Sequence, residues 1–198
     1  MRFKGTRDAS PGEGTYMKIL AIQSSPNENG LTARTAKAVL KGAREEGAKV
    51  EIVNLNEMIL KPCIACDGGW GQCRREGTCV LDDEFQSLRD SIHNADATVF
   101  ASPVYWGDLS ESAKIFLDRL RRTEVKSDFK ALNGKIALGI ASAGGTGNGC
   151  VKCLLHLEDY LRRVGFTIFD LVTVTQVSKE HKLEMLEKAG HRLAKMKP

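Results

Sequence analysis

The feature of this sequence that most constrains its fold is a repeated alternation of short apolar runs with longer segments of helical period. Three runs, at 18–23, 97–102 and 135–142, are almost continuously apolar, as expected for strands that are buried on both faces. Two further strands are expected at 48–55 and 166–174. Helices are expected at 31–46, 83–94, 109–122, 150–163 and near 180–196.

Five βα units in succession predict an α/β fold in which helices cover both faces of one open parallel sheet. A chain of 198 residues suffices for one such domain and is short for two. Its hydrophobic content of 42% is that of an ordinary globular protein, which argues against a disordered chain. We expect a single domain at 17–198 with a cysteine-rich loop at 57–82, preceded by a flexible extension at 1–16. Met17 is an alternative start of the natural protein.

Charge and hydropathy argue against several classes of function. The net charge is only +4, and acidic residues interrupt the basic run along the expected helix at 109–122, so a nucleic-acid partner is not favoured. The small positive excess suits anionic ligands such as phosphates. No apolar stretch approaches the roughly 18 residues of a membrane helix, and residues 1–16 lack the apolar core of a secretory signal. We therefore expect a cytoplasmic protein without a membrane span.

The loop after the first expected strand, 24–32 (SSPNENGLT), leads directly into a helix. Free N–H groups at that helix start, together with serine and threonine hydroxyls, suit a phosphate group. The loop has neither the GxGxxG spacing of a dinucleotide fingerprint nor the GK[ST] of a Walker loop. An ordinary turn shaped by Pro26, with Asn29 or Thr32 capping the helix, explains the same residues, and both interpretations stay open.

Two more loops follow strands at the carboxyl edge of the sheet, where ligands bind in open parallel sheets. The loop 102–110 contains Tyr105 and Trp106, which could wall a flat heterocycle, and Gly107, which would let backbone amides approach a ring. The alternative is that both aromatic side chains pack on neighbouring loops. The loop 142–149 (SAGGTGNG) either passes closely over a ligand or is simply flexible.

Four motifs, taken in this order, resemble the NAD(P)H-dependent FMN reductase and iron–sulfur flavoprotein branch of the flavodoxin-like superfamily. They are SSPNENGLT, KPCIAC with further cysteines, SPVYWGDLSESAKIFLDRL and ASAGGTG. The resemblance covers almost the whole chain from Met17. It implies a three-layer flavodoxin-like fold, with a five-stranded sheet in the order 2-1-3-4-5, bound FMN, and a homodimer or homotetramer.

The resemblance also implies a set of cofactor-binding residues. The FMN phosphate would be held by Ser25, Asn27, Asn29, Leu31 and Thr32. The isoalloxazine would be lined by Pro103, Val104, Tyr105, Trp106 and Gly107, and bordered on its other side by Ser142, Ala143 and Gly144. Many relatives have a basic residue in place of Asn27, so this chain lacks one charged contact.

Four cysteines, Cys63, Cys66, Cys73 and Cys79, are spaced as C-x2-C-x6-C-x5-C. Four thiolates in one loop suit a [4Fe–4S] cluster or, less well supported, a tetrahedral zinc ion. Reduced structural thiols and redox-active disulfides are the alternatives. Cluster-bearing relatives have a more compact motif, whose third cysteine would fall at Gly69. Because the loop leaves the carboxyl end of the second strand, we expect residues 63–79 to lie beside the flavin.

The other candidate side chains carry less weight. Cys150 and Cys153 form a second C-x2-C near a helix start, where a thiol pKa is lowered, but two small buried core residues are the preferred interpretation. The four histidines fall on expected helices without a shared ligand spacing, and surface or partly buried positions are expected for them: His93, His156, His181 and His191.

These features favour FMN-dependent transfer of electrons from NAD(P)H to a quinone, a flavin or another small acceptor. The cofactor would carry the chemistry, and Tyr105 is the one candidate for a catalytic donor near the ring. Two alternatives stay open. One is an iron–sulfur flavoprotein that passes single electrons between carriers. The other is a flavodoxin-fold module that lacks a cofactor and binds a partner through the cysteine loop.

Overall fold

The structure of the protein, a computed structural model, describes residues 16–196. Almost all of the expected extension at 1–16 therefore lies outside the described residues. Five parallel strands form one sheet in the order β2-β1-β3-β4-β5, which confirms the predicted topology. The strands are β1 (Lys18–Gln23), β2 (Lys49–Asn54), β3 (Ala97–Pro103), β4 (Ile136–Ala143) and β5 (Thr167–Thr175).

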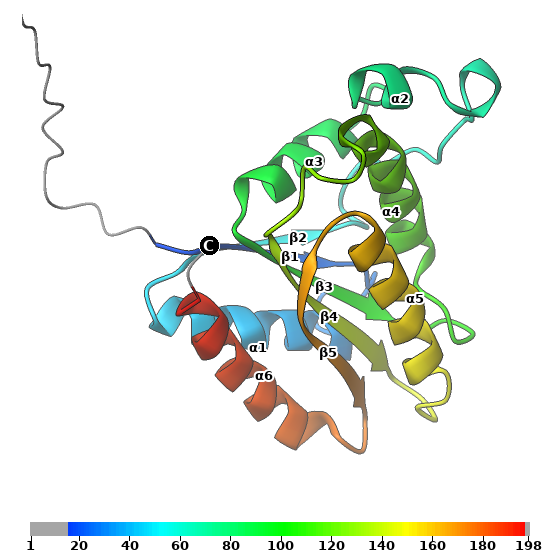
Figure 1. The fold of residues 1–198 in the computed structure, drawn as a ribbon. Coiled ribbons are helices and arrows are strands. Elements are labelled where there is room, and N and C mark those ends of the chain that lie inside the picture. Colours follow the sequence, from blue (N-terminus) through cyan, green and yellow to red (C-terminus); the bar gives the residue numbers. More distant parts are fainter. Residues whose placement is uncertain (1–15, 197–198) are drawn as a thin grey trace, which may run out of the picture.

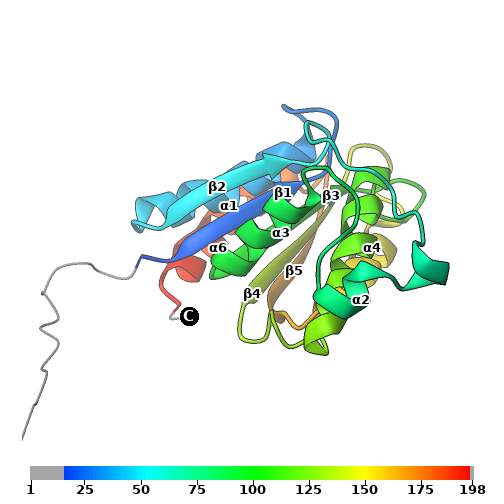
Figure 2. The same cartoon turned by 90° about the horizontal axis from the view of Figure 1, so that it is seen from above.

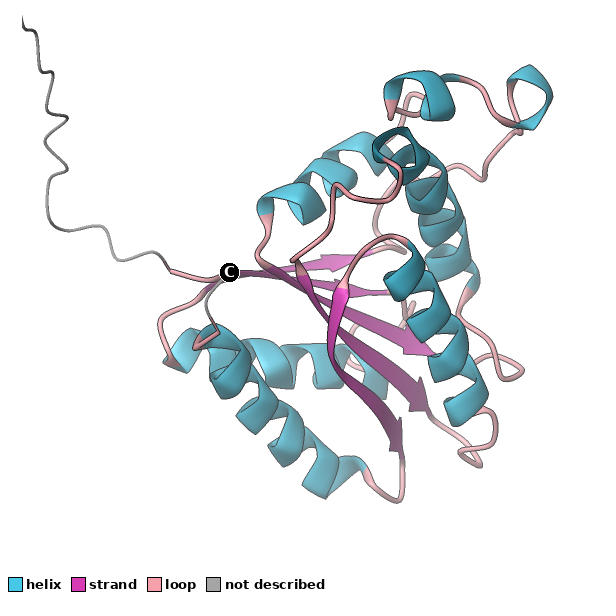
Figure 3. Ribbon diagram, viewed as in Figure 1, coloured by secondary structure: helices cyan, strands magenta, loops and turns pink. Residues whose placement is uncertain are grey.

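Helices cover both faces of the sheet, as the alternating pattern predicts (Figures 1 and 3). On one face lie α1 (Leu31–Glu45) and α6 (Lys179–Ala194). On the other lie α3 (Phe85–Asn94), α4 (Glu111–Glu124) and α5 (Cys150–Arg163). Three short helices were not expected: η1 (Asp67–Gly69) and α2 (Gln72–Glu76) in the cysteine-rich segment, and η2 (Val125–Ser127) after α4.

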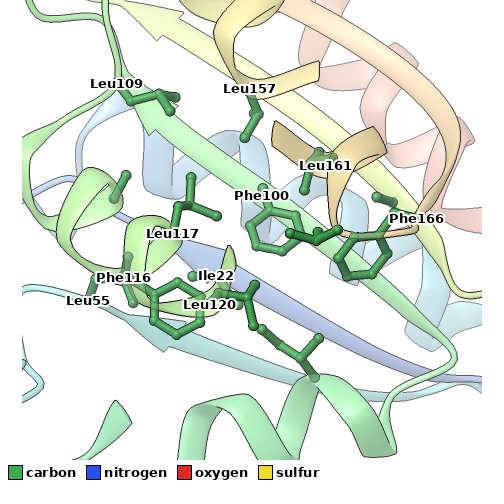
Figure 4. Packing of buried hydrophobic residues seen from close by; sticks show 14 of the residues in the cluster. Ile22, Leu55, Phe100, Leu109, Phe116, Leu117, Leu120, Leu157, Leu161 and Phe166 are labelled. Carbon is green, nitrogen blue, oxygen red and sulfur yellow. The ribbon is translucent and has the colours of Figure 1, made fainter. Parts of the chain in front are cut away.

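Each face of the sheet buries its own apolar core. All residues of β3 and β4 are buried, which explains why these two strands are such continuous apolar runs. The core beneath α3, α4 and α5 includes an edge-to-face pair between Phe100 and Phe166, whose ring centroids are 5.7 Å apart (Figure 4). The two edge strands, β2 and β5, are only partly buried.

The helices α1 and α6 approach each other closely because glycine occupies both sides of their crossing. A Cβ atom at Gly42 would lie 2.0 Å from the carbonyl oxygen of Glu187, and one at Gly190 would lie 2.0 Å from that of Val39. Any larger residue would push the helices apart. No helix in the described part of the chain is both long and apolar enough to cross a membrane.

Candidate functional site

The first and third loops meet at the carboxyl edge of the sheet. The amide of Ser24 donates to the carbonyl of Ala101 (3.0 Å), and the hydroxyl of Ser110 donates to the hydroxyl of Ser24 (2.7 Å). Ser112, in the first turn of α4, donates to the carbonyl of Ser24 (3.3 Å). These buried contacts fix the loop before α1 against the start of α4.

The third and fourth loops are also in contact. The amide of Val104 donates to the carbonyl of Ser142 (2.9 Å). Further out, a Cβ atom at Gly149 would lie only 2.6 Å from the Cα of Gly107, so the two backbones pass each other at glycines. The structure therefore brings together the three loops that were singled out in the sequence.

The loop before α1 is arranged to leave the first turn of that helix open to an anion. The N-cap position is Gly30, no side chain caps the helix, and its first turn contains no acidic residue. Asn29 and Thr32 therefore do not act as caps here. Within the loop, Ser25 Oγ accepts from the amide of Asn27 (3.2 Å), whose own side chain accepts from the amide of Asn29 (3.1 Å). Uncapped N–H groups at a helix N-terminus are typical of phosphate sites.

The third loop turns sharply between Tyr105 and Asp108, which exchange two backbone hydrogen bonds of 3.0 and 2.9 Å. The residues between them, Trp106 and Gly107, both have positive φ angles, 52° and 76°. The turn places the Trp106 side chain entirely in solvent, and Tyr105 is about half exposed. The alternative in which Trp106 packs on neighbouring loops is therefore wrong.

Asp108 is a residue of this loop that the sequence analysis did not single out. Its carboxylate lies 3.0 Å from His156 Nδ1 on α5 and 3.2 Å from Lys114 Nζ on α4. Burial alone would raise the pKa of Asp108, but the hydrogen bonds from the Leu109 amide, His156 and Lys114 outweigh it and lower the pKa to about 2. Asp108 thus stays ionised near neutral pH and holds two basic groups beside the third loop. Its contact with His156 spans 48 residues, so no local spacing signals it.

The fourth loop leaves free space and an unused hydrogen-bonding group. A Cβ atom at Gly144 or Gly145 would meet nothing within 4 Å. The hydroxyl of Ser142 is buried and has no hydrogen-bond partner among the described residues. An unpaired buried hydroxyl is unusual, and a ligand seated against this loop would explain it. Together with the uncapped start of α1, these residues fit FMN.

All four clustered cysteines line one small cavity, which we call the cysteine cavity. The second half of α4 forms its opposite wall through Arg119, Arg122 and Thr123. A Cβ atom at Gly71 would lie 2.7 Å from Cys66 Sγ, so glycine is needed for the chain to pass this sulfur. Burial raises the pKa of the Cys73 thiol. The cysteines are free thiols in the structure.

The spacing of the four sulfurs discriminates between the two metal centres considered. A tetrahedral zinc ion, with Zn–S bonds near 2.3 Å, would bring its sulfurs to about 3.8 Å from one another. No three of these sulfurs lie within 4.8 Å of one another in the part of the chain that the structure describes. A multi-iron cluster spaces its four cysteines more widely. The spacing of these sulfurs therefore fits a multi-iron cluster better than a single zinc ion.

A buried ion pair closes the segment that carries the cysteines. Arg119 is 1% exposed and donates to both carboxylate oxygens of Asp83 (2.6 and 2.9 Å). It also donates to the carbonyl of Lys61 (2.9 Å), and its guanidinium lies over the Phe85 ring. Asp83 in turn accepts from the amide of Lys61 (2.8 Å). The pair therefore joins the two ends of the segment, before Cys63 and after Cys79, to α4.

The expectation that the whole segment 63–79 lies beside the flavin needs correction. Its beginning, Pro62 and Cys63, shares a groove of about 410 Å³ with Leu109 at the end of the third loop, and this groove runs between α4 and α5. The remaining cysteines line a cavity with residues of the stretch 119–123 of α4. At a rise of 1.5 Å per residue, this stretch lies about 14–20 Å along the helix axis from the N-cap residue Ser110. Figure 2 shows α2 beside α4, away from the loop that follows β1. The segment folds back along α4, because α4 runs antiparallel to the strands.

The second cysteine pair forms part of the core. Cys150 and Cys153 are buried on α5, and burial raises the pKa of Cys153 to about 12. The burial of both cysteines agrees with the interpretation that they are core residues. Among the histidines, His93 contacts the buried carboxylate of Glu124 (3.0 Å), and His191 contacts glutamates at the end of α1.

Comparisons with known proteins identify the family and the fold of this chain. Residues 17–179 match the family described as NADPH-dependent FMN reductase. An iron-sulfur flavoprotein of Methanocaldococcus jannaschii is 31% identical over 130 residues, which is 65% of this chain and 65% of that protein, just under two thirds of its length. An NAD(P)H dehydrogenase (quinone) of Archaeoglobus fulgidus is 28% identical over 90% of this chain and 96% of its own. The solved NAD(P)H:quinone oxidoreductase from Methanothermobacter marburgensis has the same fold, with a TM-score of 0.73 at 19% identity, and covers 93% of this chain and 100% of its own.

Proposed function

Because the chain belongs to the NADPH-dependent FMN reductase family, and is thus a flavodoxin-like oxidoreductase, we propose that it uses bound FMN to pass electrons from NAD(P)H to a small acceptor such as a quinone or a free flavin. The observation that carries the proposal is that the first loop, which leads to the uncapped N-terminus of α1, contacts the third loop, which in turn contacts the fourth. The donor and the acceptor are the parts of this proposal that rest on similarity to named relatives.

Each loop has a distinct part in the proposed site. The first turn of α1, with Ser25 and Thr32, binds the phosphate. The backbone of 103–107 and the loop beginning at Ser142 frame the ring system, and the free hydroxyl of Ser142 is available to it. FMN, when bound, supplies the exchange of a hydride or of single electrons. Asp108 holds Lys114 and His156 beside the proposed position of the ring edge, and the charge of Lys114 would favour an anionic donor or acceptor there.

The absorption spectrum of the purified protein and its NAD(P)H oxidation test this proposal. We expect the bands of oxidised flavin and their loss on anaerobic addition of NADH or NADPH, followed by their return when a quinone is added. Released cofactor should be FMN and not FAD, since the loop provides for one phosphate group. A colourless protein that takes up no FMN would refute the proposal. A protein that binds FMN but is not reduced by either nicotinamide would refute only the donor.

A second candidate function is favoured by the cysteine cavity, in which four thiols face two arginines. We propose that Cys63, Cys66, Cys73 and Cys79 hold a [4Fe–4S] cluster, and that the protein then passes single electrons between this centre and the flavin. The similarity to a protein named iron-sulfur flavoprotein supports it. Cys63 lines both the cysteine cavity and the groove that reaches the third loop, so the groove would connect the two centres.

Iron and labile sulfide in anaerobically purified protein test the second candidate. Four irons and four sulfides per chain are expected, with loss of both in Cys66→Ser and retention of FMN. The matched control is Cys150→Ser, which changes a thiol outside the cavity and should retain the cluster. Zinc in place of iron, or free thiols only, would refute the cluster. The proposed homodimer or homotetramer is tested separately by light scattering of the same preparation.

A further inference from the structure

A cavity at the opposite edge of the sheet from the three loops has no part in the proposed function. Its volume is about 300 Å³, and its wall is formed by Trp70, Arg74, Arg121, Val125, Phe129 and Arg163. These residues come from the cysteine segment, α2, the end of α4 with η2, the loop after it, and the end of α5. Because α5 begins after the carboxyl end of β4 and ends before β5, Arg163 lies at the amino edge of the strands.

The wall of this cavity is strongly cationic. It contains three arginines and no acidic residue. Arg121 pairs with Asp118 at 3.4 Å, but neither Arg74 nor Arg163 has an ion-pair partner within 16–196. Arginine is the side chain best suited to phosphate, since its planar guanidinium can donate two parallel hydrogen bonds. Arg74 and Arg163 are exposed and line the same cavity, so it offers two guanidinium groups to an anionic ligand.

Two aromatic rings line the same cavity and are held in place by arginines. The Arg122 guanidinium lies 4.9 Å from the Trp70 ring centroid and that of Arg121 lies 5.5 Å from it. Arg163 lies over the Phe129 ring at 5.7 Å. Trp70 nevertheless remains 37% exposed. Partly exposed, fixed aromatic rings are suited to contact with a planar heterocycle.

The backbone that presents Phe129 is strained. Asp128 and Phe129 are consecutive non-glycine residues with φ angles of 53° and 59°, a conformation that is costly for a bulky side chain. The strained conformation is held by the hydrogen bond from the Phe129 amide to the backbone carbonyl of Glu124 (3.0 Å). It is also held by the close approach of Gly165, where a Cβ atom would lie 2.6 Å from the Phe129 carbonyl oxygen. Arginines near the ends of α4 and α5 would be favourable for the helix dipoles alone. That effect does not account for the two rings or for the strain.

We propose that this cavity binds a nucleoside phosphate, with the base against Trp70 and Phe129 and the phosphate between Arg74 and Arg163. The volume lies at the lower end of that of small-ligand sites, which run from about 300 to 1,000 Å³. The ligand is independent of the flavin, since the cavity and the three loops lie at opposite edges of the sheet. Arg122 contacts Trp70 in this cavity and also lines the cysteine cavity, so it joins these two cavities.

Isothermal titration calorimetry with adenosine 5′-monophosphate tests the proposal. The titration is done with FMN-loaded protein from which free FMN has been removed by gel filtration, so that the phosphate loop before α1 is occupied and no excess FMN competes for the cavity. We expect saturable binding at one site, with adenosine and inorganic phosphate each weaker by about tenfold or more. Arg163→Gln should weaken nucleotide binding by about tenfold or more, because a charged hydrogen bond is lost. The matched control is Arg162→Gln, whose side chain pairs with Glu158 outside the cavity.

Phe129→Gly is a second variant. It should fold, because glycine relieves the backbone strain at this position, and it should bind the nucleotide more weakly, because the aromatic ring is removed. Its thermal unfolding checks that it is folded. The proposal is overturned if the nucleotide gives no saturable heat, or if Arg163→Gln and Arg162→Gln bind it equally. It is also overturned if a short polyglutamate peptide binds more tightly than the nucleotide, which would identify the surface as a docking site for an acidic protein.

Discussion

Replacement of Arg119 by methionine tests the interpretation that one buried ion pair closes the cysteine segment. The substitution removes two hydrogen bonds to Asp83 and one to the Lys61 carbonyl, and it leaves a carboxylate that is fully buried. Removing one partner of a buried pair costs about 3–5 kcal/mol, mostly because the remaining charge is uncompensated. We therefore expect Arg119→Met to lower the free energy of unfolding by about that amount.

Urea unfolding at pH 7 measures this loss, and Arg162→Met is the control. Arg162 pairs with Glu158 on the surface of α5, where such a pair is worth about 0.3–0.5 kcal/mol. Asp83→Asn introduced into Arg119→Met should recover part of the stability, because it removes the unpaired charge. If Arg119→Met and Arg162→Met lost similar amounts, the pair would not be the closure that we infer.

The pH dependence of the stability difference between Arg119→Met and the native protein provides a second test of the ion pair. Burial alone would raise the pKa of Asp83, but Arg119 and the amides of Lys61 and Phe85 outweigh it and hold the pKa below its usual value. The contribution of this lowered pKa is fully present above about pH 4 and is lost as the pH falls further. In Arg119→Met a protonated Asp83 is the more favourable form. The difference in stability between variant and native protein should therefore shrink between pH 7 and pH 3, and a difference that grew would refute the assignment.

Three further predictions concern other parts of the molecule. Gly42→Ala should lower the free energy of unfolding by about 1–3 kcal/mol, since its Cβ would lie 2.0 Å from the Glu187 carbonyl oxygen; a stability equal to or above that of the native protein would contradict the close crossing of α1 and α6. Cys153 should resist alkylation by iodoacetamide at pH 8 in the folded protein, as its pKa is raised to about 12, and peptide mass analysis would reveal the opposite result. Asp108→Asn should lower the free energy of unfolding by about 1 kcal/mol or less at pH 7, because the carboxylate is 38% exposed. This loss should disappear as the pH approaches 2, where Asp108 of the native protein becomes protonated. A loss that does not depend on pH would show that the charge of Asp108 does not stabilise these contacts.

The regular elements were predictable because their physical causes are local. Continuous apolar runs mark strands covered on both faces, and the expected bounds of β1, α5 and α3 differ from the observed ones by two residues at most. The short helix α2 has only five residues, too few for a helical period to show in the sequence, and it is held by packing against α4 and η2.

The site was predictable only in part, for a related reason. Its loops follow from topology, since the carboxyl ends of parallel strands share one edge. The pairing of Asp108 with His156 and of Asp83 with Arg119 depends on helices that only the tertiary fold brings together. The course of the cysteine segment also depends on the tertiary fold, because the ion pair to α4 directs the chain back along that helix. The position of the segment after β2 predicts only where its first residues, Pro62 and Cys63, lie.

Whether the start of α1 binds the phosphate of a flavin can be measured by comparing the binding of FMN and of riboflavin to flavin-free protein. The two ligands share the ring system and differ only in the phosphate, so the ratio of their dissociation constants isolates that contact. We predict that FMN binds more tightly by about tenfold or more, since charged hydrogen bonds are worth about 1.5–3 kcal/mol each. Ser25→Ala combined with Thr32→Ala should reduce this preference and leave riboflavin binding unchanged. Equal affinity for FMN and riboflavin in the native protein would contradict the assignment of the site.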